Sequence, residues 1–247
     1  MLSQLSITDI IIVSLAAFIL GLSKSGIKGI SIIIVAMMVF VFDAKASTGI
    51  LLPMLIVGDV FAVIYYNRHA EWKFLFKLLP PMAVGVLVGT WVGDQVPTEV
   101  FRKSMAIIIL ISVVMMIWWD KRKSKSVPDN LGYAGAMGFT AGFTTMVGNL
   151  AGSFANLYFL AMQLPKNAFI GTTAWLFLII NLFKVPFHIY AWQTISLETA
   201  AVSFSFAPAI FLGLFVGVKL LKRINDKLFR NFILFATAVG AILIFLT

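Results

Sequence analysis

The sequence has no cysteine and only two histidines, His69 and His188. The lack of cysteine excludes disulfides, thiolate metal sites and catalytic thiols, and two histidines cannot form a histidine-rich metal centre. Nothing resembles the GxxxxGK[ST] phosphate-binding loop, which excludes a nucleotide-driven pump within this chain. The start of the chain also lacks the basic region and cleavage site of a secretory signal, so its apolar run is expected to remain as a transmembrane element.

Charged residues are scarce as well. They make up 12% of the 247 residues, hydrophobic residues make up 61%, and the mean hydropathy is +1.01. Soluble domains are about 25% charged and about 45–50% apolar, and a water-soluble fold of this length could not bury so much apolar surface. The sequence therefore predicts an all-α, polytopic membrane protein whose outer faces contact the lipid bilayer. The net charge of +9 is interpreted as an excess of basic residues in cytoplasmic loops, not as a nucleic-acid-binding surface.

Ten apolar segments are separated by polar or glycine-containing breaks. They cover residues 7–22, 27–42, 48–66, 74–92, 105–119, 131–143, 150–162, 169–190, 197–221 and 229–246. A straight membrane-spanning helix needs about 20 apolar residues. Because the first two segments of each half are shorter, we expect broken or half-membrane helices there. Such backbone is tolerated within a membrane only where protein or a water-filled cavity surrounds it.

The chain contains an internal duplication. An offset of 122 residues aligns Ala46 and Gly49 with Ala168 and Gly171, and it aligns Asp59 with Asn181. An offset of 128 then aligns three residues of the first half (Pro80, Gly85, Gly89) with three of the second (Pro208, Gly213, Gly217). We therefore expect a first membrane repeat over residues 1–120, a basic cytoplasmic linker over 121–130, and a second membrane repeat over 131–247.

The distribution of basic residues predicts the orientation. Fifteen of the 19 lysines and arginines lie in one set of alternate loops, and only Lys45, Arg102 and Lys103 lie in the other. The basic loops should be cytoplasmic, so both termini should be extracytoplasmic in a multi-pass protein of the inner (plasma) membrane. With five segments per half, the second repeat should enter the membrane from the opposite side. The loop at 68–77 is basic, whereas the equivalent loop at 192–198 has no basic residue, as inverted repeats require.

Inverted repeats with paired broken helices are typical of secondary transporters, whose substrate site lies near mid-membrane between the repeats. The two breaks cover residues 21–29 and 142–152. They contain small polar side chains, glycines and a lysine that are suited to an anion: Ser23, Lys24, Ser25, Gly26, Thr144, Thr145, Gly148 and Asn149. Two other interpretations stay open. The glycines are also suited to close helix packing, and Lys24 and Lys28 fit equally well as cytoplasmic loop charges.

Lys184 is the strongest single signal, because it lies inside the apolar run 175–187. A lysine near mid-membrane is costly unless it is paired, so it is functional by default. Asn181 precedes it by one turn on the same helix face. We expect Asp59, the one charged residue within 51–66, to form a buried ion pair with Lys184, either as a structural pair or as a coupling site for a proton or cation. His188, close to Tyr190 and Trp192, is interpreted as a structural histidine in an interfacial aromatic belt.

These features together resemble the sulfite exporter TauE/SafE family, also called the toluene sulfonate uptake permease family. The run Gly171-Thr172-Thr173 followed by Asn181, Lys184 and Tyr190 is similar to the second-half signature of that family. Asp59 and the region of Trp72 resemble its first-half counterpart. The consecutive glycines usual after each break are thinned here to Gly26-Ile-Lys28-Gly29 and Gly148-Asn149-Leu-Ala-Gly152. The resemblance implies a carrier for sulfur-containing oxyanions or organosulfonates.

The function predicted from the sequence is therefore secondary transport of a small sulfur-containing anion by alternating access, in the direction of export. Sulfite, thiosulfate and organosulfonates such as sulfoacetate are the expected substrates, with Asn181 and Lys184 completing the site. We expect no catalytic residues, cofactor or metal. A passive anion channel and a non-transporting membrane scaffold are the alternatives. An intramembrane enzyme is disfavoured, because no base and oxyanion-stabilising set accompanies Ser23-Lys24. A homo-oligomer stays open.

Overall fold

The computed structural model describes residues 5–25, 30–66, 69–121, 130–220 and 242, and the regular structure in these ranges is helical. Helices are expected in lipid because they satisfy all their backbone hydrogen bonds internally. The helices are α1 (Ile7–Lys24), α2 (Ser31–Val41), α3 (Ala44–Tyr66), α4 (Trp72–Gln95), α5 (Thr98–Lys121), α6 (Leu131–Gly148), α7 (Ala151–Ala161), α8 (Lys166–Pro186), α9 (Leu197–Ser205) and α10 (Ala207–Leu220). A π-helix, η3 (Phe187–Ala191), continues α8.

The predicted apolar segments coincide with these helices over the first nine segments, with ends that differ by a few residues. The tenth, at 229–246, lies outside the described residues except for Ile242, as does most of the predicted linker at 121–130. The main difference is in the segment 197–221, which ends one helix at Ser205 and begins another at Ala207. Pro208 explains this division, because it has no N–H to donate to the carbonyl of Phe204.

Both predicted breaks contain helix ends. α1 ends at Lys24 and α6 ends at Gly148, and each is followed by a helix of 11 residues, α2 and α7. Eleven residues rise about 16 Å, roughly half of the 30 Å thickness of a hydrocarbon core. At the second break Asn149 adopts a left-handed conformation, with φ 56° and ψ 30°, which ends α6. Residues 26–29 of the first break lie outside the described residues.

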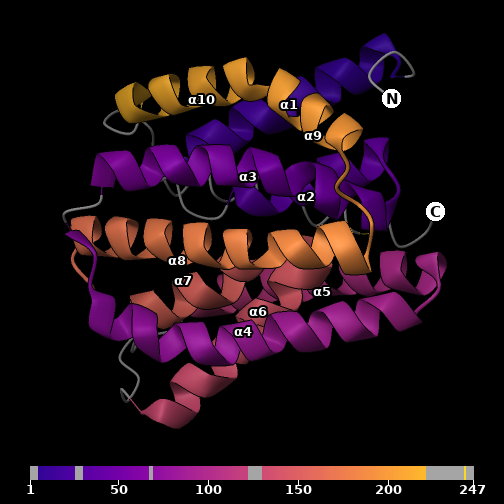
Figure 1. The fold of residues 1–247 in the computed structure, drawn as a ribbon. Coiled ribbons are helices and arrows are strands. Elements are labelled where there is room, and N and C mark those ends of the chain that lie inside the picture. Colours follow the sequence, from indigo (N-terminus) through magenta and orange to yellow (C-terminus); the bar gives the residue numbers. More distant parts are fainter. Residues whose placement is uncertain (1–4, 26–29, 67–68, 122–129, 221–241, 243–247) are drawn as a thin grey trace.

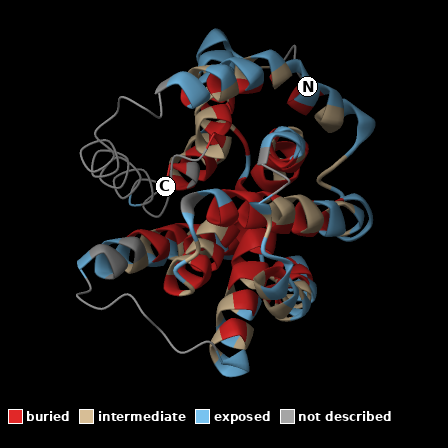
Figure 2. Ribbon diagram, turned by 90° about the vertical axis from the view of Figure 1, so that its left-hand side faces the viewer, coloured by how far each residue is buried: buried red, intermediate tan, exposed pale blue. Residues whose placement is uncertain are grey.

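The helices form layers around a central pair, α3 and α8, which lie side by side (Figure 1). α1 packs on α10 on one side of this pair, and α4 packs on α6 on the other. Viewed along the helices, the buried residues gather where these layers meet and the exposed residues lie on the outside (Figure 2). The core therefore surrounds α3 and α8, and it includes Asp59 of α3 and Lys184 in the last turn of α8.

Glycines allow the two outer pairs to pack with their backbones in contact. A Cβ atom at Gly21 in α1 would lie 2.1 Å from the carbonyl oxygen of Ile210 in α10. A Cβ atom at Gly142 in α6 would lie 1.9 Å from the carbonyl oxygen of Met82 in α4. Small residues permit this close approach in membrane proteins. For Gly21 and Gly142, the alternative interpretation of close helix packing therefore holds.

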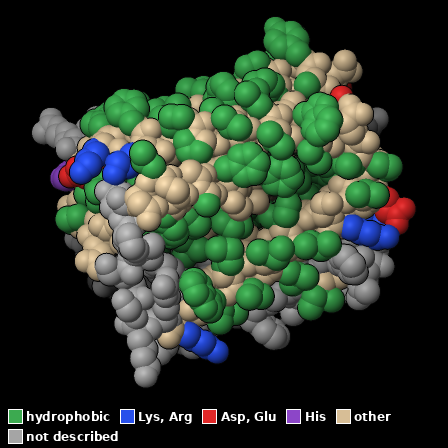
Figure 3. Space-filling view, turned by 90° about the horizontal axis from the view of Figure 1, so that it is seen from below, with side chains coloured by type: hydrophobic (Ala, Val, Ile, Leu, Met, Phe, Trp, Pro, Cys, Tyr) green, Lys and Arg blue, Asp and Glu red, His purple; other side chains and the backbone are tan. Residues whose placement is uncertain are grey.

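The outer surface is suited to lipid. Five helical stretches within the described residues are long and apolar enough to span a membrane, namely Ile7–Lys24, Ala44–Tyr65, Trp72–Gln95, Asn167–Ala191 and Leu197–Lys219. Figure 3 shows one face of the molecule covered largely by hydrophobic side chains, with charged side chains gathered toward its two ends. An apolar band between charged ends is the pattern expected of a membrane protein.

Candidate functional site

A polar cluster lies in the core between α3 and α8, and its centre is Asp59. The side chain of Asp59 is 0% exposed. Its Oδ1 atom lies 2.5 Å from Nζ of Lys24 at the end of α1, and its Oδ2 atom accepts a hydrogen bond of 2.7 Å from Nδ2 of Asn181 in α8. Lys24 also lies over the ring of Phe177, 5.2 Å from its centroid. Lys24 is thus part of the buried cluster and not a free loop charge.

Lys184 lies one helical turn after Asn181 and is also 0% exposed. Its Nζ atom donates to Oδ1 of Asn149 at 2.5 Å, to Oγ1 of Thr145 at 3.2 Å and to Oδ1 of Asn181 at 3.3 Å. These three acceptors are neutral. An ammonium group has three donors, so amide and hydroxyl oxygens occupy all of them.

The prediction of a direct ion pair between Asp59 and Lys184 is corrected here. The ion pair of Asp59 is with Lys24, and Lys184 is linked to Asp59 through the amide of Asn181. The sequence showed that one carboxylate and one ammonium are buried, but it did not show that α1 brings a second ammonium closer to the carboxylate.

The charges of the cluster do not balance. Two ammonium groups, Lys24 and Lys184, share one carboxylate, Asp59, within the described part of the chain. In a medium of low dielectric constant an uncompensated buried charge is costly. The arrangement therefore favours the entry of one negative charge close to Lys184.

The second break contributes directly to the cluster. Asn149 holds Lys184 with its amide oxygen, and its amide nitrogen donates to the carbonyl oxygen of Thr48 in α3 at 3.1 Å. The left-handed backbone of Asn149 turns this side chain toward α3 and α8. α7 begins two residues later with no side-chain cap, and Oγ of Ser153 in its first turn is buried with no hydrogen-bond partner in the described structure.

Other predicted donors use their hydroxyl hydrogens within their own helices. Ser23 donates to Leu20 O and Ser25 to Leu22 O, at 2.8 and 2.7 Å. Thr144 donates to Thr140 O at 2.8 Å. These contacts are common for hydroxyls in helices. A Cβ atom at Gly148 would meet the side chains of Leu150 and Met105, and Gly26 lies outside the described residues.

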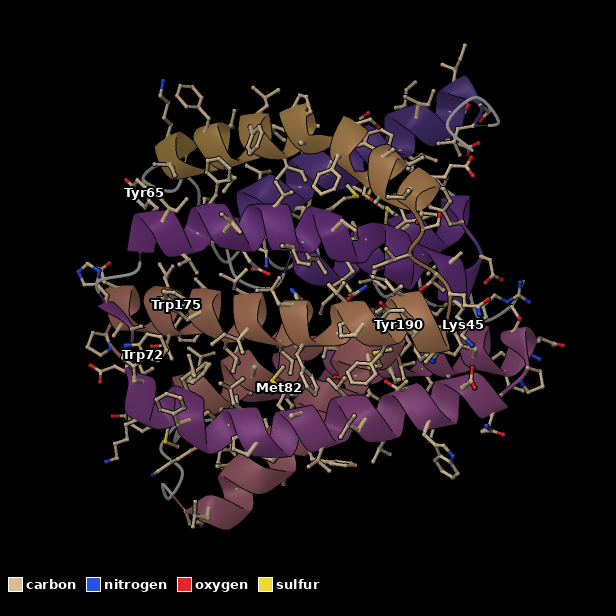
Figure 4. The ribbon with its side chains drawn as sticks, viewed as in Figure 1. Lys45, Tyr65, Trp72, Met82, Trp175 and Tyr190 are labelled. Carbon is tan, nitrogen blue, oxygen red and sulfur yellow. The ribbon has the colours of Figure 1, made fainter. Side chains whose placement is uncertain are left out.

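A cavity of about 370 Å³ reaches the cluster at Lys24. It is lined by Lys24 and Ser25 at the end of α1, by Phe61, Ala62 and Tyr65 of α3, and by residues of α10. Tyr65 lies with Trp72 and Trp175 at one end of the helix layers, whereas Lys45 and Tyr190 lie at the other end (Figure 4). The cavity therefore approaches the cluster from the end that carries Tyr65.

The family model described as sulfite exporter TauE/SafE matches residues 11–244 of this chain. The chain belongs to this family. Comparison with individual curated proteins gave no match. Membership in TauE/SafE implies membrane transport of sulfite or related anions, and together with the apolar helices it identifies a multi-pass membrane protein. The resemblance stated from the sequence is thereby confirmed.

His188, interpreted from the sequence as a structural histidine in an interfacial aromatic belt, packs its ring against Trp192 with centroids 5.2 Å apart. Its side chain is 0% exposed and lies one turn beyond Lys184, so it is more deeply buried than a belt residue would be. Its Nδ1 atom is 2.8 Å from Oγ1 of Thr194. His188 follows Lys184 by four residues, a spacing that puts two side chains on one helix face. This spacing was the sequence signal that could have connected His188 with Lys184.

Proposed function

We propose that this TauE/SafE protein is a secondary carrier that exports a small sulfur-containing oxyanion, such as sulfite, thiosulfate or an organosulfonate, by alternating access. The observation that carries the proposal is the environment of Lys184. It is fully buried in the middle of the helix layers, and its partners among the described residues are two amides and one hydroxyl. An intramembrane cation with neutral partners is suited to a mobile counter-ion.

The residues around Lys184 can bind an oxyanion with several oxygens. The ammonium group of Lys184 supplies charge, and the hydroxyl of Thr145 can turn to donate once an anion takes its place as acceptor. The first turn of α7 lies next to Asn149 and has no side-chain cap. Helix N-termini favour anions through their free N–H groups and dipole, and the buried Oγ of Ser153 adds a donor in that turn.

Inverted repeats would explain how the site opens alternately to each side. The glycine contacts support such repeats. Gly21 faces Ile210, whereas Gly142 faces Met82. The two contacts correspond to one another under the duplication. Gly142 of the second half follows Gly21 of the first by 121 residues, and Ile210 of the second half follows Met82 of the first by 128. A second pair of contacts corresponds in the same way: Gly85 contacts Phe139, and Gly213 contacts Phe18.

The cavity beside Lys24 supports access from the cytoplasm. It opens near Tyr65, at the end of α3 that the basic loops predict to be cytoplasmic. Asp59, which holds Lys24, is the carboxylate at which a coupling proton or cation would act. Export would begin with an anion that enters this cavity and meets Lys24 before it reaches Lys184.

Reconstituted vesicles provide the test. Purified protein should carry labelled sulfite with a rate that saturates, and unlabelled sulfite on the opposite side should accelerate it by counterflow. A gradient of pH across the vesicle should change the accumulated amount if Asp59 couples transport to protons. A rate that rises linearly with sulfite, without counterflow, would indicate a passive channel. The absence of any flux in correctly inserted protein would indicate a scaffold.

A further inference from the structure

His188 lies where α8 loses its regular hydrogen-bond pattern. Pro186 cannot donate to the carbonyl of Leu182, and the chain continues as the π-helix η3, in which Trp192 N donates to Phe187 O at 2.9 Å. π-helical turns occur frequently at functional sites, because the wider turn redirects side chains. Here it places the ring of His188 inside the protein, beyond Lys184.

The ring of His188 is held firmly from one side. Nδ1 lies 2.8 Å from Oγ1 of Thr194, and the backbone carbonyl of His188 accepts from the N–H groups of Thr194 and Ile195 at 2.8 and 3.2 Å. The ring also packs edge-on against Trp192, with centroids 5.2 Å apart. Gly49 permits this arrangement, because a Cβ atom there would lie 2.5 Å from Cβ of Thr194.

The other ring nitrogen, Nε2, is buried and has no hydrogen-bond partner in the described structure. Leaving a buried polar atom unsatisfied is costly. The contact with Thr194 accounts for Nδ1 but not for Nε2. The Nε2 atom therefore points to a ligand.

The surrounding charges indicate the sign of that ligand. Two basic residues lie near His188: Lys184, four residues earlier on the same helix, and Lys45 of α3, which contacts the ring of Trp192 against which His188 packs. Lys45 lies over the ring of Trp192 at 5.1 Å and 3.7 Å from Oδ1 of Asp94 in α4. Asp94 partly compensates Lys45, whereas the partners of Lys184 among the described residues are all neutral, so the net charge near His188 is positive and favours an anion over a metal cation.

We propose that Nε2 of His188 donates a hydrogen bond to the transported anion, at a second binding position between Lys184 and the end of the molecule that carries Lys45. This inference rests on the proposed function and extends it. The hydroxyl of Thr194 has two acceptors, Nδ1 of His188 at 2.8 Å and the carbonyl oxygen of His188 at 3.5 Å. Donation to the nearer one, Nδ1, puts the ring proton on Nε2, so Thr194 is a positioning residue. The ring of Trp192, which packs against that of His188, is itself fixed by a hydrogen bond from its Nε1 to Thr90 O at 3.0 Å.

Two substitutions of equal chemistry separate a binding role from a structural one. His188→Asn places an amide where Nδ1 lies and can keep the contact with Thr194. His188→Gln places its amide where Nε2 lies and can keep the contact with the anion. We expect His188→Asn to fold normally and to lose at least about tenfold in sulfite flux at low concentration, as for one lost hydrogen bond to a charged group. His188→Gln should retain more flux.

Ser112→Ala is the matched control. Oγ of Ser112 is also buried without a partner in the described structure, but it lies on α5, away from Lys184. Its removal should leave sulfite flux unchanged. If His188→Asn carries sulfite as fast as the wild type, or if His188→Gln is the poorer of the two in flux, the ring serves structure alone and the proposal is wrong.

Nitrogen-15 NMR gives a readout that does not depend on transport. The chain has two histidines, and His69 is exposed, so a His69→Gln variant leaves one labelled ring. Sodium sulfite should shift the Nε2 resonance of His188, and sodium gluconate should not. A resonance that stays fixed while sulfite raises the Tm of the same sample overturns the proposal. A shifted resonance in protein that carries no sulfite would instead sink the proposed function and leave this contact standing.

Discussion

Asn181 and Asp59, which the internal duplication aligns with one another, are hydrogen-bonded at 2.7 Å. If the halves are related by a twofold axis, as we propose, two equivalent residues that touch must lie close to that axis. The amide of Asn181 also accepts from Lys184 at 3.3 Å, and Asp59 pairs with Lys24 at 2.5 Å. The two ammonium groups are therefore joined through this one contact between α3 and α8, and a change at either lysine will alter the hydrogen bonds of the other.

Replacement of Lys184 by glutamine should separate transport from folding. The three partners of Lys184 are neutral, and glutamine can keep one or two of these hydrogen bonds. We therefore expect a loss of stability of about 1–3 kcal/mol but a loss of sulfite flux of at least about a hundredfold, because the positive charge is gone. Thermal unfolding in detergent and vesicle flux measure the two effects. Lys103→Ala, at an exposed lysine paired with Glu99, is the control and should change neither.

Replacement of Asp59 by asparagine should have the larger effect on stability. It leaves Lys24 without its carboxylate, and breaking a buried ion pair typically costs about 3–5 kcal/mol. The side chain of Lys24 is 12% exposed and borders the cavity, so the cost should lie near the lower value. In the double variant Lys24→Met/Asp59→Asn the charge of Lys24 is removed together with its carboxylate, so the Tm should recover, with Lys184 left as the ammonium group of the cluster. A double variant no more stable than Asp59→Asn would show that the pair is not what stabilises this region.

The glycine contacts predict a difference between two positions of α6 that are seven residues apart. A methyl group at Gly142 would meet the backbone of α4 at 1.9 Å, whereas one at Gly135 would meet nothing within 4 Å. Gly142→Ala should therefore separate α4 from α6 and lower the Tm strongly. Gly135→Ala should be neutral or raise stability by up to about 1 kcal/mol, as expected for alanine in a helix. Equal Tm values for the two variants would argue against this packing.

Much of the fold follows from the order of apolar and polar residues. Segment lengths predicted two short helices in each half. The second of each, α2 and α7, has 11 residues and is too short to cross a membrane, but the first of each, α1 and α6, has 18 residues, longer than predicted. The division between α9 and α10 could not be predicted in the same way. Pro208 ends a helix there, whereas Pro80, at the equivalent place of the first half, lies inside the continuous helix α4. Whether a proline ends a helix or is tolerated inside it depends on how neighbouring helices stabilise the backbone. The sequence of a single segment does not contain that information.

The candidate site was only partly predictable for a similar reason. Polar residues inside apolar runs had to find partners, so the sequence indicated Asn149, Asn181 and Lys184, which the structure brings together. It could not indicate which cation lies nearest Asp59, because that depends on how α1 crosses α3. It also could not indicate that Ser23 donates within its own helix, because hydroxyls have a carbonyl acceptor available at every turn.

The orientation of the halves can be tested with single cysteines in this cysteine-free chain. Ala70, before α4, and Glu198, at the start of α9, occupy equivalent loops of the two halves. If the repeats are inverted, a membrane-impermeant maleimide should label Ala70→Cys only from the cytoplasmic side and Glu198→Cys only from the opposite side. Labelling of both from one side would exclude inverted repeats. Val100 lies in the first turn of α5 and is exposed. The variant Val100→Cys should be labelled from the same side of the membrane as Glu198→Cys.

Asn149 combines a backbone role with a side-chain role, and two substitutions distinguish them. Its φ of 56° is unfavourable for alanine and readily adopted by glycine, while its amide contacts Lys184 and Thr48. Asn149→Gly should therefore be more stable than Asn149→Ala by about 1 kcal/mol. Both should lose sulfite flux to a similar extent, because both lack the amide that holds Lys184.

Gln163, just after α7, is the matched control for the backbone. It has φ 54° and is exposed, so Gln163→Gly should keep full flux and match or exceed the wild-type Tm. If Asn149→Gly also keeps full flux, the amide does not contribute to the site and Asn149 serves only to end α6. If Asn149→Gly unfolds as readily as Asn149→Ala while Gln163→Gly does not, the hydrogen bonds of the amide, and not the left-handed backbone, determine the stability of the break. Thermal unfolding with and without sulfite, measured beside flux on the same preparations, separates these outcomes, because sulfite should stabilise only variants in which Lys184 is still positioned to bind it.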